Sequence, residues 1–173
     1  SRPDFGDPDR LHEATVCVVM SAVETRLAAA GLTLPEATAP LAAYVPAVLS
    51  GRYVYTSGQL PVVDGELIAT GKVGVEIEPE HAAELAARCA LNAIAAIKSV
   101  IGDLDKVVRV VKVVGFVASD PDFSGQPAVM NGASTLLLEA FGDAGRHARS
   151  AVGVAVLPRN APVEVEVIVE VAD

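Results

Sequence analysis

The chain has 173 residues and a mass of 17.8 kDa, a size that suits one domain with a buried core. Its formal net charge of −9 would repel a phosphate backbone, so we expect no nucleic-acid partner. No apolar run reaches the roughly 18 residues of a membrane span, and Cys17 and Cys89 lack metal-ligand spacing, so we expect a cytoplasmic protein without membrane contact or metal.

The first residues are polar and acidic, unlike the basic start of a secretory signal. Because Met20 resembles a natural start, residues 1–19 are expected to be disordered or derived from cloning, and residues 20–173 to form a single domain. Ser21 and Glu24 match a capping box, which predicts a short helix over about residues 22–30 that ends at Gly31.

Two β-rich runs, residues 45–49 and 53–56, lie on either side of Ser50 and Gly51 and predict a hairpin. Asp64 and Gly65 predict a second tight turn. A long helix is expected from Pro79 to about Ile101, because proline is tolerated in a first helical turn and Gly102 is a common helix stop.

Residues 106–118 are dense in valine, a composition typical of a strand buried on both faces. A second long helix should begin near Pro127, contain Asn131 and stop at Gly142. Two closing strands are expected at 150–157 and 163–171, and the second alternates valine with mostly glutamate, which predicts one core face and one polar face. This order predicts an α+β fold: a single mixed β-sheet with two long helices on one face and an extra N-terminal helix.

Two sequence blocks are distinctive in combination. Tyr53-Val-Tyr-Thr-Ser-Gly-Gln-Leu-Pro61 lies in the first half of the chain, and Ala148-Arg-Ser, Leu157-Pro and Val163-Glu-Val-Glu follow in the second. In this order, over roughly residues 41–172, they resemble the RidA family, also called YjgF/YER057c/UK114. Tyr44-Val-Pro and Gly145-Arg-His-Ala-Arg149 are similar to a longer branch of that family.

The resemblance implies a chorismate-mutase-like (RidA) fold, a homotrimer with clefts between subunits, and a reaction without cofactor. The implied reaction is hydrolysis of a reactive enamine or imine, such as 2-aminoacrylate, to a 2-keto acid and ammonia. Arg149 is implied as the residue that binds the substrate carboxylate, through a planar fork that lysine cannot copy. Glu164 is implied to position or activate a water, and a guanidinium beside it would keep its carboxylate ionised.

The remaining implied substrate-binding residues are Tyr44, contributed by a neighbouring subunit, and Ser57, Gly58, Asn131, His147 and Ala151. Ala151 replaces a cysteine of many family members and His147 replaces a proline, so the pocket departs from the usual pattern. His147 is either a titratable pocket residue or an exposed ring. Glu166 is expected to be a solvated strand residue.

Two other functions are compatible with the same residues. A trimer could hold a small carboxylate at Arg149 as a binding or sensing protein, without turning it over. An endoribonuclease is disfavoured by the charge of −9 and by the absence of a histidine pair.

Overall fold

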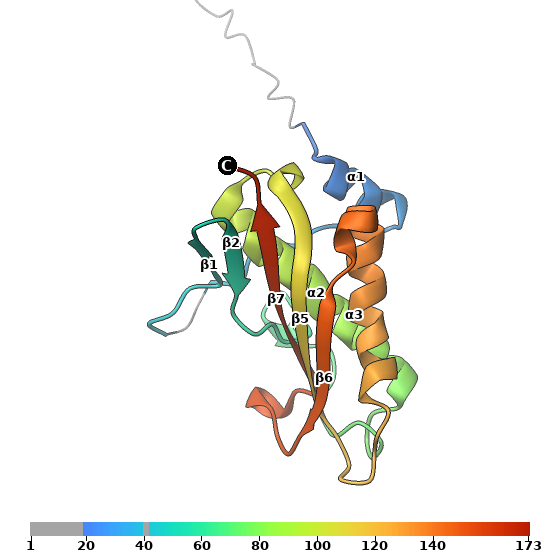
Figure 1. The fold of residues 1–173 in the computed structure, drawn as a ribbon. Helices are drawn as coiled ribbons and strands as arrows, with labels where there is room; N and C mark the ends of the chain where they lie inside the picture. The colour runs from blue at the N-terminus through green and yellow to red at the C-terminus, as the bar shows by residue number, and fades with distance from the viewer. Residues whose placement is uncertain (1–18, 40–41) are drawn as a thin grey trace, which may run out of the picture.

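The computed structural model describes residues 19–39 and 42–173. Apart from its last residue, the segment predicted to be disordered or cloning-derived, residues 1–19, lies outside these ranges. The main sheet has five strands in the order β1-β2-β7-β5-β6, in which β5 and β6 are parallel and the other neighbours antiparallel. Helices α2 and α3 lie against one face of this sheet, and α1 lies beside the end of α3, so the predicted α+β fold is confirmed (Figure 1).

The strands of the main sheet are β1 (Ala47–Ser50), β2 (Tyr53–Thr56), β5 (Val107–Ala118), β6 (Ala148–Val154) and β7 (Val163–Val171). The helices are α1 (Ala22–Ala29), α2 (Pro79–Ile101) and α3 (Gln126–Phe141). Short 3-10 segments occupy Leu104–Lys106, Gly142–Gly145 and Pro158–Asn160, and β3 (Val62–Val63) pairs with β4 (Glu66–Leu67) in a separate hairpin.

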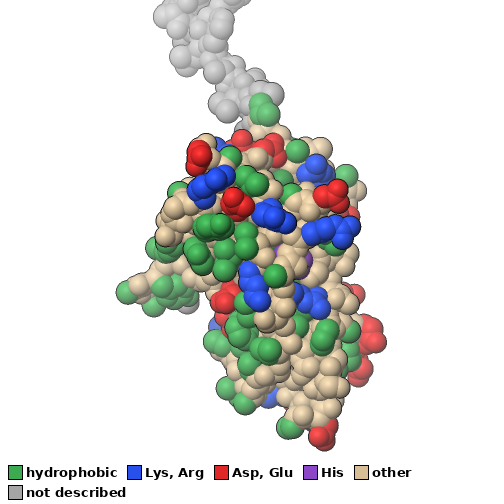
Figure 2. All heavy atoms as spheres, in the orientation of Figure 1, with side chains coloured by type: hydrophobic (Ala, Val, Ile, Leu, Met, Phe, Trp, Pro, Cys, Tyr) green, Lys and Arg blue, Asp and Glu red, His purple; other side chains and the backbone are tan. Residues whose placement is uncertain are grey.

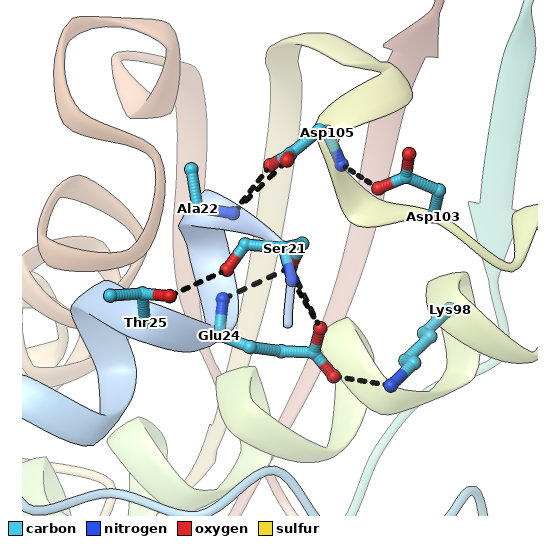
Figure 3. Close-up of polar contacts among 7 residues, drawn as sticks. All are labelled: Ser21, Ala22, Glu24, Thr25, Lys98, Asp103 and Asp105. Atoms are coloured by element: carbon cyan, nitrogen blue, oxygen red, sulfur yellow. Dashed lines mark hydrogen bonds and ion pairs between the residues drawn. The ribbon is translucent and has the colours of Figure 1, made fainter. Parts of the chain in front are cut away.

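The predicted capping box begins α1 (Figure 3). The Glu24 amide donates to Ser21 Oγ at 3.1 Å, and the Ser21 amide donates to Glu24 Oε2 at 3.0 Å. Glu24 also forms an ion pair with Lys98 of α2, and the Asp105 carboxylate accepts from the Ala22 amide at 3.0 Å. These contacts attach the N-terminal helix to α2 and to the turn that follows it.

The predicted turns are confirmed, because glycines with positive φ allow the chain to reverse where L side chains are strained. Gly51 has φ 59° between β1 and β2, and Gly65 has φ 81° between β3 and β4. The first strand begins at Ala47, two residues later than predicted. Helix α2 ends at Gly102, as predicted, and the start of α3 lies one residue before Pro127.

Small residues set the distance between the two long helices. A Cβ on Gly132 of α3 would lie 1.9 Å from the Ala83 carbonyl oxygen of α2, so the two backbones approach each other closely at this point. The core beneath the helices is built from valine, alanine, leucine and isoleucine, as expected for a chain with 4% aromatic residues. None of the helices in the described part of the chain is long and apolar enough to cross a membrane.

The sheet has one covered face and one open face. The odd-numbered valines of β7, from Val163 to Val171, are buried under the helices, and Glu164, Glu166, Ile168 and Glu170 are partly exposed on the open face. The prediction that residues 106–118 are buried on both faces is wrong for the single chain. Val110, Val113 and Val117 are buried, but Val114 and Phe116 are only half-buried, because no second layer covers the open face. Hydrophobic and basic side chains share this face (Figure 2).

Candidate functional site

Arg149 lies near the start of β6, the edge strand at one end of the sheet. This strand spans Ala148–Val154 rather than the predicted 150–157, because Leu157 and Pro158 already belong to the following turn. Arg149 pairs with Val113, whose side chain is buried under the helices. Since paired residues of neighbouring strands point to the same face, the Arg149 side chain points to the helix side, toward α3.

Three acceptors from one face of α3 hold the Arg149 guanidinium. Nη1 donates to Asn131 Oδ1 at 2.9 Å and to Ser134 Oγ at 3.1 Å, and Nη2 donates to the Pro127 carbonyl at 3.3 Å. Residues 127, 131 and 134 recur at the spacing of one helix face. We call Asn131, Ser134, His147 and Arg149 the arginine cluster.

These contacts leave one edge of the guanidinium free. Arginine has five N–H donors, and the protein uses both donors of Nη1 and one of Nη2. The donors without a partner among the described residues are Nε–H and the second N–H of Nη2. These two nitrogens share an edge of the planar group, and such an edge can donate two parallel hydrogen bonds to a carboxylate.

His147 lies beside Arg149 on the same side of the sheet. Its Nε2 is 2.9 Å from Ser134 Oγ, and its Nδ1 is 2.6 Å from the Gly145 carbonyl oxygen. Both ring nitrogens therefore have protein partners. The arginine cluster lines a shallow hollow of about 310 Å³.

The second group of predicted residues gathers at the other end of the sheet, where β2 ends. We call Tyr44, Ser57, Gly58 and Glu164 the glutamate cluster. The Ser57 hydroxyl donates to the Val45 carbonyl at 2.6 Å. A Cβ on Gly58 would lie 1.9 Å from Glu164 Oε1, so the Glu164 carboxylate lies against the Gly58 backbone and would have to move to make room for a side chain there.

Backbone pairing fixes the segment that carries Ser57 and Gly58. Gln59 and Val165 exchange backbone hydrogen bonds of 2.8 and 3.0 Å, and Thr56 Oγ1 accepts from the Val167 amide at 3.0 Å. The buried Asn92 of α2 donates to the carbonyls of Leu60 and Val62 at 3.0 and 3.1 Å. These bonds hold the segment that follows Gln59. This part of the cluster is thus built on rigid elements.

Tyr44, Ser57 and Gly58 line a cavity of about 410 Å³. Its other walls include the apolar Pro46, Leu60 and Val62, and the Arg159 side chain, which donates to the Gly65 carbonyl at 3.1 Å. The Tyr44 ring is 56% exposed. The cavity can therefore take an apolar or mixed group, and the Glu164 carboxylate lies against Gly58 of its wall.

Burial raises the pKa of Glu164 above its ordinary value of 4.5, and the neighbouring charge of Glu166 raises it further. Within the single chain burial and Glu166 set the direction of this shift, and the expectation that an adjacent guanidinium keeps the carboxylate ionised stays a prediction. A raised pKa makes Glu164 a stronger base than an exposed glutamate. Glu166, predicted to be only a solvated residue, thus acts electrostatically on Glu164.

The two clusters do not meet within one chain. Glu164 pairs with Phe116, so both side chains lie on the open face, whereas Arg149 lies on the helix side. Strand β5 also separates β6, which carries Arg149, from β7, which carries Glu164. One chain therefore holds the Arg149 guanidinium and the Glu164 carboxylate at separate places.

Three further groups lie on the helix side near Arg149. Ala151 lies two residues after Arg149 on the helix side, where it packs against the core. Ser134 and the Pro127 carbonyl, which hold the arginine, were not predicted. Ser134 is three residues after Asn131 on a predicted helix, and this spacing was a usable signal. No group of three or more His, Cys, Asp or Glu side chains in residues 19–39 and 42–173 could hold a metal ion.

Comparison with known proteins shows the family of this chain. Residues 24–171 match the family model described as "YjgF/chorismate_mutase-like, putative endoribonuclease". The chain belongs to this family. YjgF is another name of the RidA family, which the two sequence blocks resemble. The predicted family is therefore confirmed.

Individual proteins also match most of the chain. Protein TCP17 of Trypanosoma cruzi is 45% identical over 154 residues, which cover 88% of this chain and 96% of that protein. Atu1372 from Agrobacterium tumefaciens, a solved structure, is 47% identical with a TM-score of 0.81, and the match covers 87% of this chain and 93% of that one. A solved "putative endoribonuclease" from Shewanella oneidensis is 36% identical with a TM-score of 0.83, covering 86% and 99% of the two chains.

Proposed function

We propose that this YjgF-family protein hydrolyses reactive enamines and imines of the 2-aminoacrylate type to 2-keto acids and ammonia. The observation that carries the proposal is the held guanidinium of Arg149, whose Nε and Nη2 edge remains available to a carboxylate. A substrate with a carboxylate next to its imine carbon fits this edge. The reaction itself needs only modest acceleration, because imines also hydrolyse in water.

Arg149 binds the substrate carboxylate through two parallel, charge-assisted hydrogen bonds. This contact orients the imine carbon and removes translational freedom that would otherwise slow the attack of water. Because Asn131, Ser134 and Pro127 already hold the guanidinium, little of its motion is lost on binding.

Glu164 acts as the base for the attacking water. An enamine first shifts a proton from nitrogen to its terminal carbon and becomes the imine. Water oxygen then bonds to the imine carbon, one water proton passes to Glu164, and Glu164 returns that proton to the imine nitrogen, which becomes an amine. The carbon–nitrogen bond breaks as the new hydroxyl passes its proton to that nitrogen, which leaves the 2-keto acid, ammonia and an ionised Glu164. The raised pKa of Glu164 suits both uptake and return of a proton.

The proposed active site requires groups from more than one subunit. Arg149 and Glu164 lie on opposite faces of the sheet in one chain, so a second chain must supply the missing group. We propose a homotrimer in which the glutamate cluster of one subunit faces the arginine cluster of the next, with Tyr44 beside the substrate. The open face of the sheet offers apolar side chains for such an interface.

The Arg149→Ala variant tests the carboxylate contact. We expect kcat/KM for an imine generated in place by an amino-acid oxidase to fall by about 100-fold or more, because two charge-assisted bonds are lost. Arg149→Lys should also lose most activity, since one ammonium cannot copy the fork. Arg146→Ala is the matched control: it removes a nearby positive charge whose partner is Asp143 at 3.7 Å, so only a small change is expected.

Unchanged turnover in Arg149→Ala would contradict the proposed site. Binding of a 2-keto acid without measurable turnover of any imine would favour the sensing function instead. Cleavage of RNA by the purified wild type, lost in Arg149→Ala, would support the activity that the family description names.

A further inference from the structure

Ser134 lies between Arg149 and His147 and contacts both side chains. Arginine has donors only, so Ser134 Oγ must accept the hydrogen bond from Nη1, and its own proton is then free to be donated to His147 Nε2. His147 Nδ1 consequently carries the ring proton and donates it to the Gly145 carbonyl. In the neutral imidazole, the direction of every hydrogen bond in this chain of contacts is fixed, because the Gly145 carbonyl can only accept and so requires the ring proton on Nδ1.

The Gly145 carbonyl, at the end of this series of hydrogen bonds, is held in place. Gly145 is buried, and a Cβ at this position would lie 2.4 Å from the Leu137 carbonyl oxygen of α3. The turn that presents the Gly145 carbonyl is therefore packed against the same helix that carries Asn131 and Ser134. His147 thus joins two fixed points, the Gly145 carbonyl and the Ser134 hydroxyl.

We propose that Ser134 and His147 are positioning residues for Arg149, and that His147 does not contact the substrate through its ring nitrogens. Ser134 and His147 fix the plane of the guanidinium, so that Nε and Nη2 face the carboxylate. This inference rests on the proposed function of Arg149 as the carboxylate-binding residue. It gives His147, which replaces the proline of other family members, a role in the affinity for the substrate.

Loss of either residue should weaken binding rather than slow the chemical step. Without Ser134, Nη1 loses one of its two acceptors and the long side chain regains rotational freedom that substrate binding must then remove. The water and Glu164 belong to the other cluster and are unaffected. The ground state and the transition state both contain the carboxylate, so KM should rise while kcat changes little.

The test measures pyruvate binding by calorimetry, together with KM and kcat for the imine, on the intact protein. Ser134→Ala and His147→Phe should each raise the pyruvate Kd and the imine KM roughly three- to tenfold, the range expected for one hydrogen bond. Ser134→Thr keeps the hydroxyl, and His147→Gln places an amide oxygen near Nε2 that accepts from Ser134. Both conservative variants should bind pyruvate within about twofold of the wild type.

The double variant Ser134→Ala with His147→Phe should bind no more weakly than Ser134→Ala alone, because both residues act through the same contact. Unchanged pyruvate binding in Ser134→Ala and His147→Phe, with binding abolished in Arg149→Ala, would overturn the positioning role and leave the proposed function intact. Equal losses in His147→Gln and His147→Phe would also overturn it. Unchanged binding in Arg149→Ala would remove both proposals.

Discussion

Glu164 is the residue whose protonation should control activity. A base works only when ionised, so kcat/KM should fall as the pH drops through the pKa of Glu164. Because burial raises this pKa, the fall should lie above 4.5, the ordinary value. Removing the charge of Glu166 should lower the pKa of Glu164, and the Glu166→Gln variant should therefore keep activity to lower pH than the wild type.

The measurement is kcat/KM against pH for the wild type and Glu166→Gln. Glu170→Gln is the matched control, because Glu170 lies on the same face of β7 but does not influence the pKa of Glu164. The fall of kcat/KM at low pH in Glu170→Gln should coincide with that of the wild type. A fall in Glu166→Gln that stays in place or moves to higher pH would contradict the assignment of Glu164 as the base.

Gly58 controls where the Glu164 carboxylate can lie. In Gly58→Ala the new methyl group would occupy the position of Glu164 Oε1, so the flexible end of that side chain must move away. We expect a loss of kcat of about tenfold or more, with a melting temperature within about 3 °C of the wild type. Gly153→Ala, on β6, is the control: its methyl group would meet only the ends of the Gln126 and Ser119 side chains.

Equal kcat for Gly58→Ala and the wild type would show that the position of Glu164 does not matter for the reaction. A large loss of stability in Gly58→Ala would instead show that the backbone here cannot adapt to a side chain.

Helix α3 carries three groups that hold Arg149, so its distance from α2 matters for both stability and function. Glycine to alanine inside a helix ordinarily stabilises by about 1 kcal/mol. At Gly132 the added Cβ would meet the backbone of Ala83 at 1.9 Å, and a backbone cannot move aside as a side chain does. We therefore expect Gly132→Ala to lower the free energy of unfolding by about 1–3 kcal/mol.

Urea unfolding at a fixed protein concentration measures this effect, with Thr135→Ala as the control because Thr135 is exposed on the same helix. A Gly132→Ala protein as stable as the wild type would contradict the close approach of α3 to α2 at this glycine. The variant should also raise the KM, since a shift of α3 moves Asn131 and Ser134 away from Arg149.

At the scale of the whole molecule, the open face of the sheet predicts assembly. Val48, Tyr55 and Val152 expose apolar surface there, on three strands. Light scattering should give about 53 kDa, three times the chain mass of 17.8 kDa. Val48→Glu places a charge on this face and should yield monomers that have lost activity, because neither cluster is complete alone.

Val75→Glu is the matched control for this substitution. Val48 is 50% exposed and Val75 is 58% exposed, but Val75 lies in the loop before α2, outside the five strands of the main sheet. The control should remain trimeric and active. A wild-type monomer with full activity would contradict both the assembly and the division of the site between subunits.

Local sequence patterns determined most of the fold. The capping box at Ser21 and Glu24, the glycines at turns and helix ends, and the alternating valines of 163–171 each encode their structure within a few residues. Hydrogen bonds to neighbouring amides and side-chain periodicity are local interactions, so they can be read without the rest of the chain. Recognition of the sequence blocks placed Arg149, Asn131, Ser57 and Glu164 among the candidate site residues.

Only the tertiary structure decided how those residues are arranged. Strand pairing placed Arg149 and Glu164 on opposite faces of the sheet, and it left valine-rich β5 with one face uncovered. The contact of Ser134 with both Arg149 and His147 joins segments 13 and 15 residues apart. Such contacts depend on the register of β6 against β5 and on the packing of α3. A one-residue shift in that register would turn Arg149 to the other face.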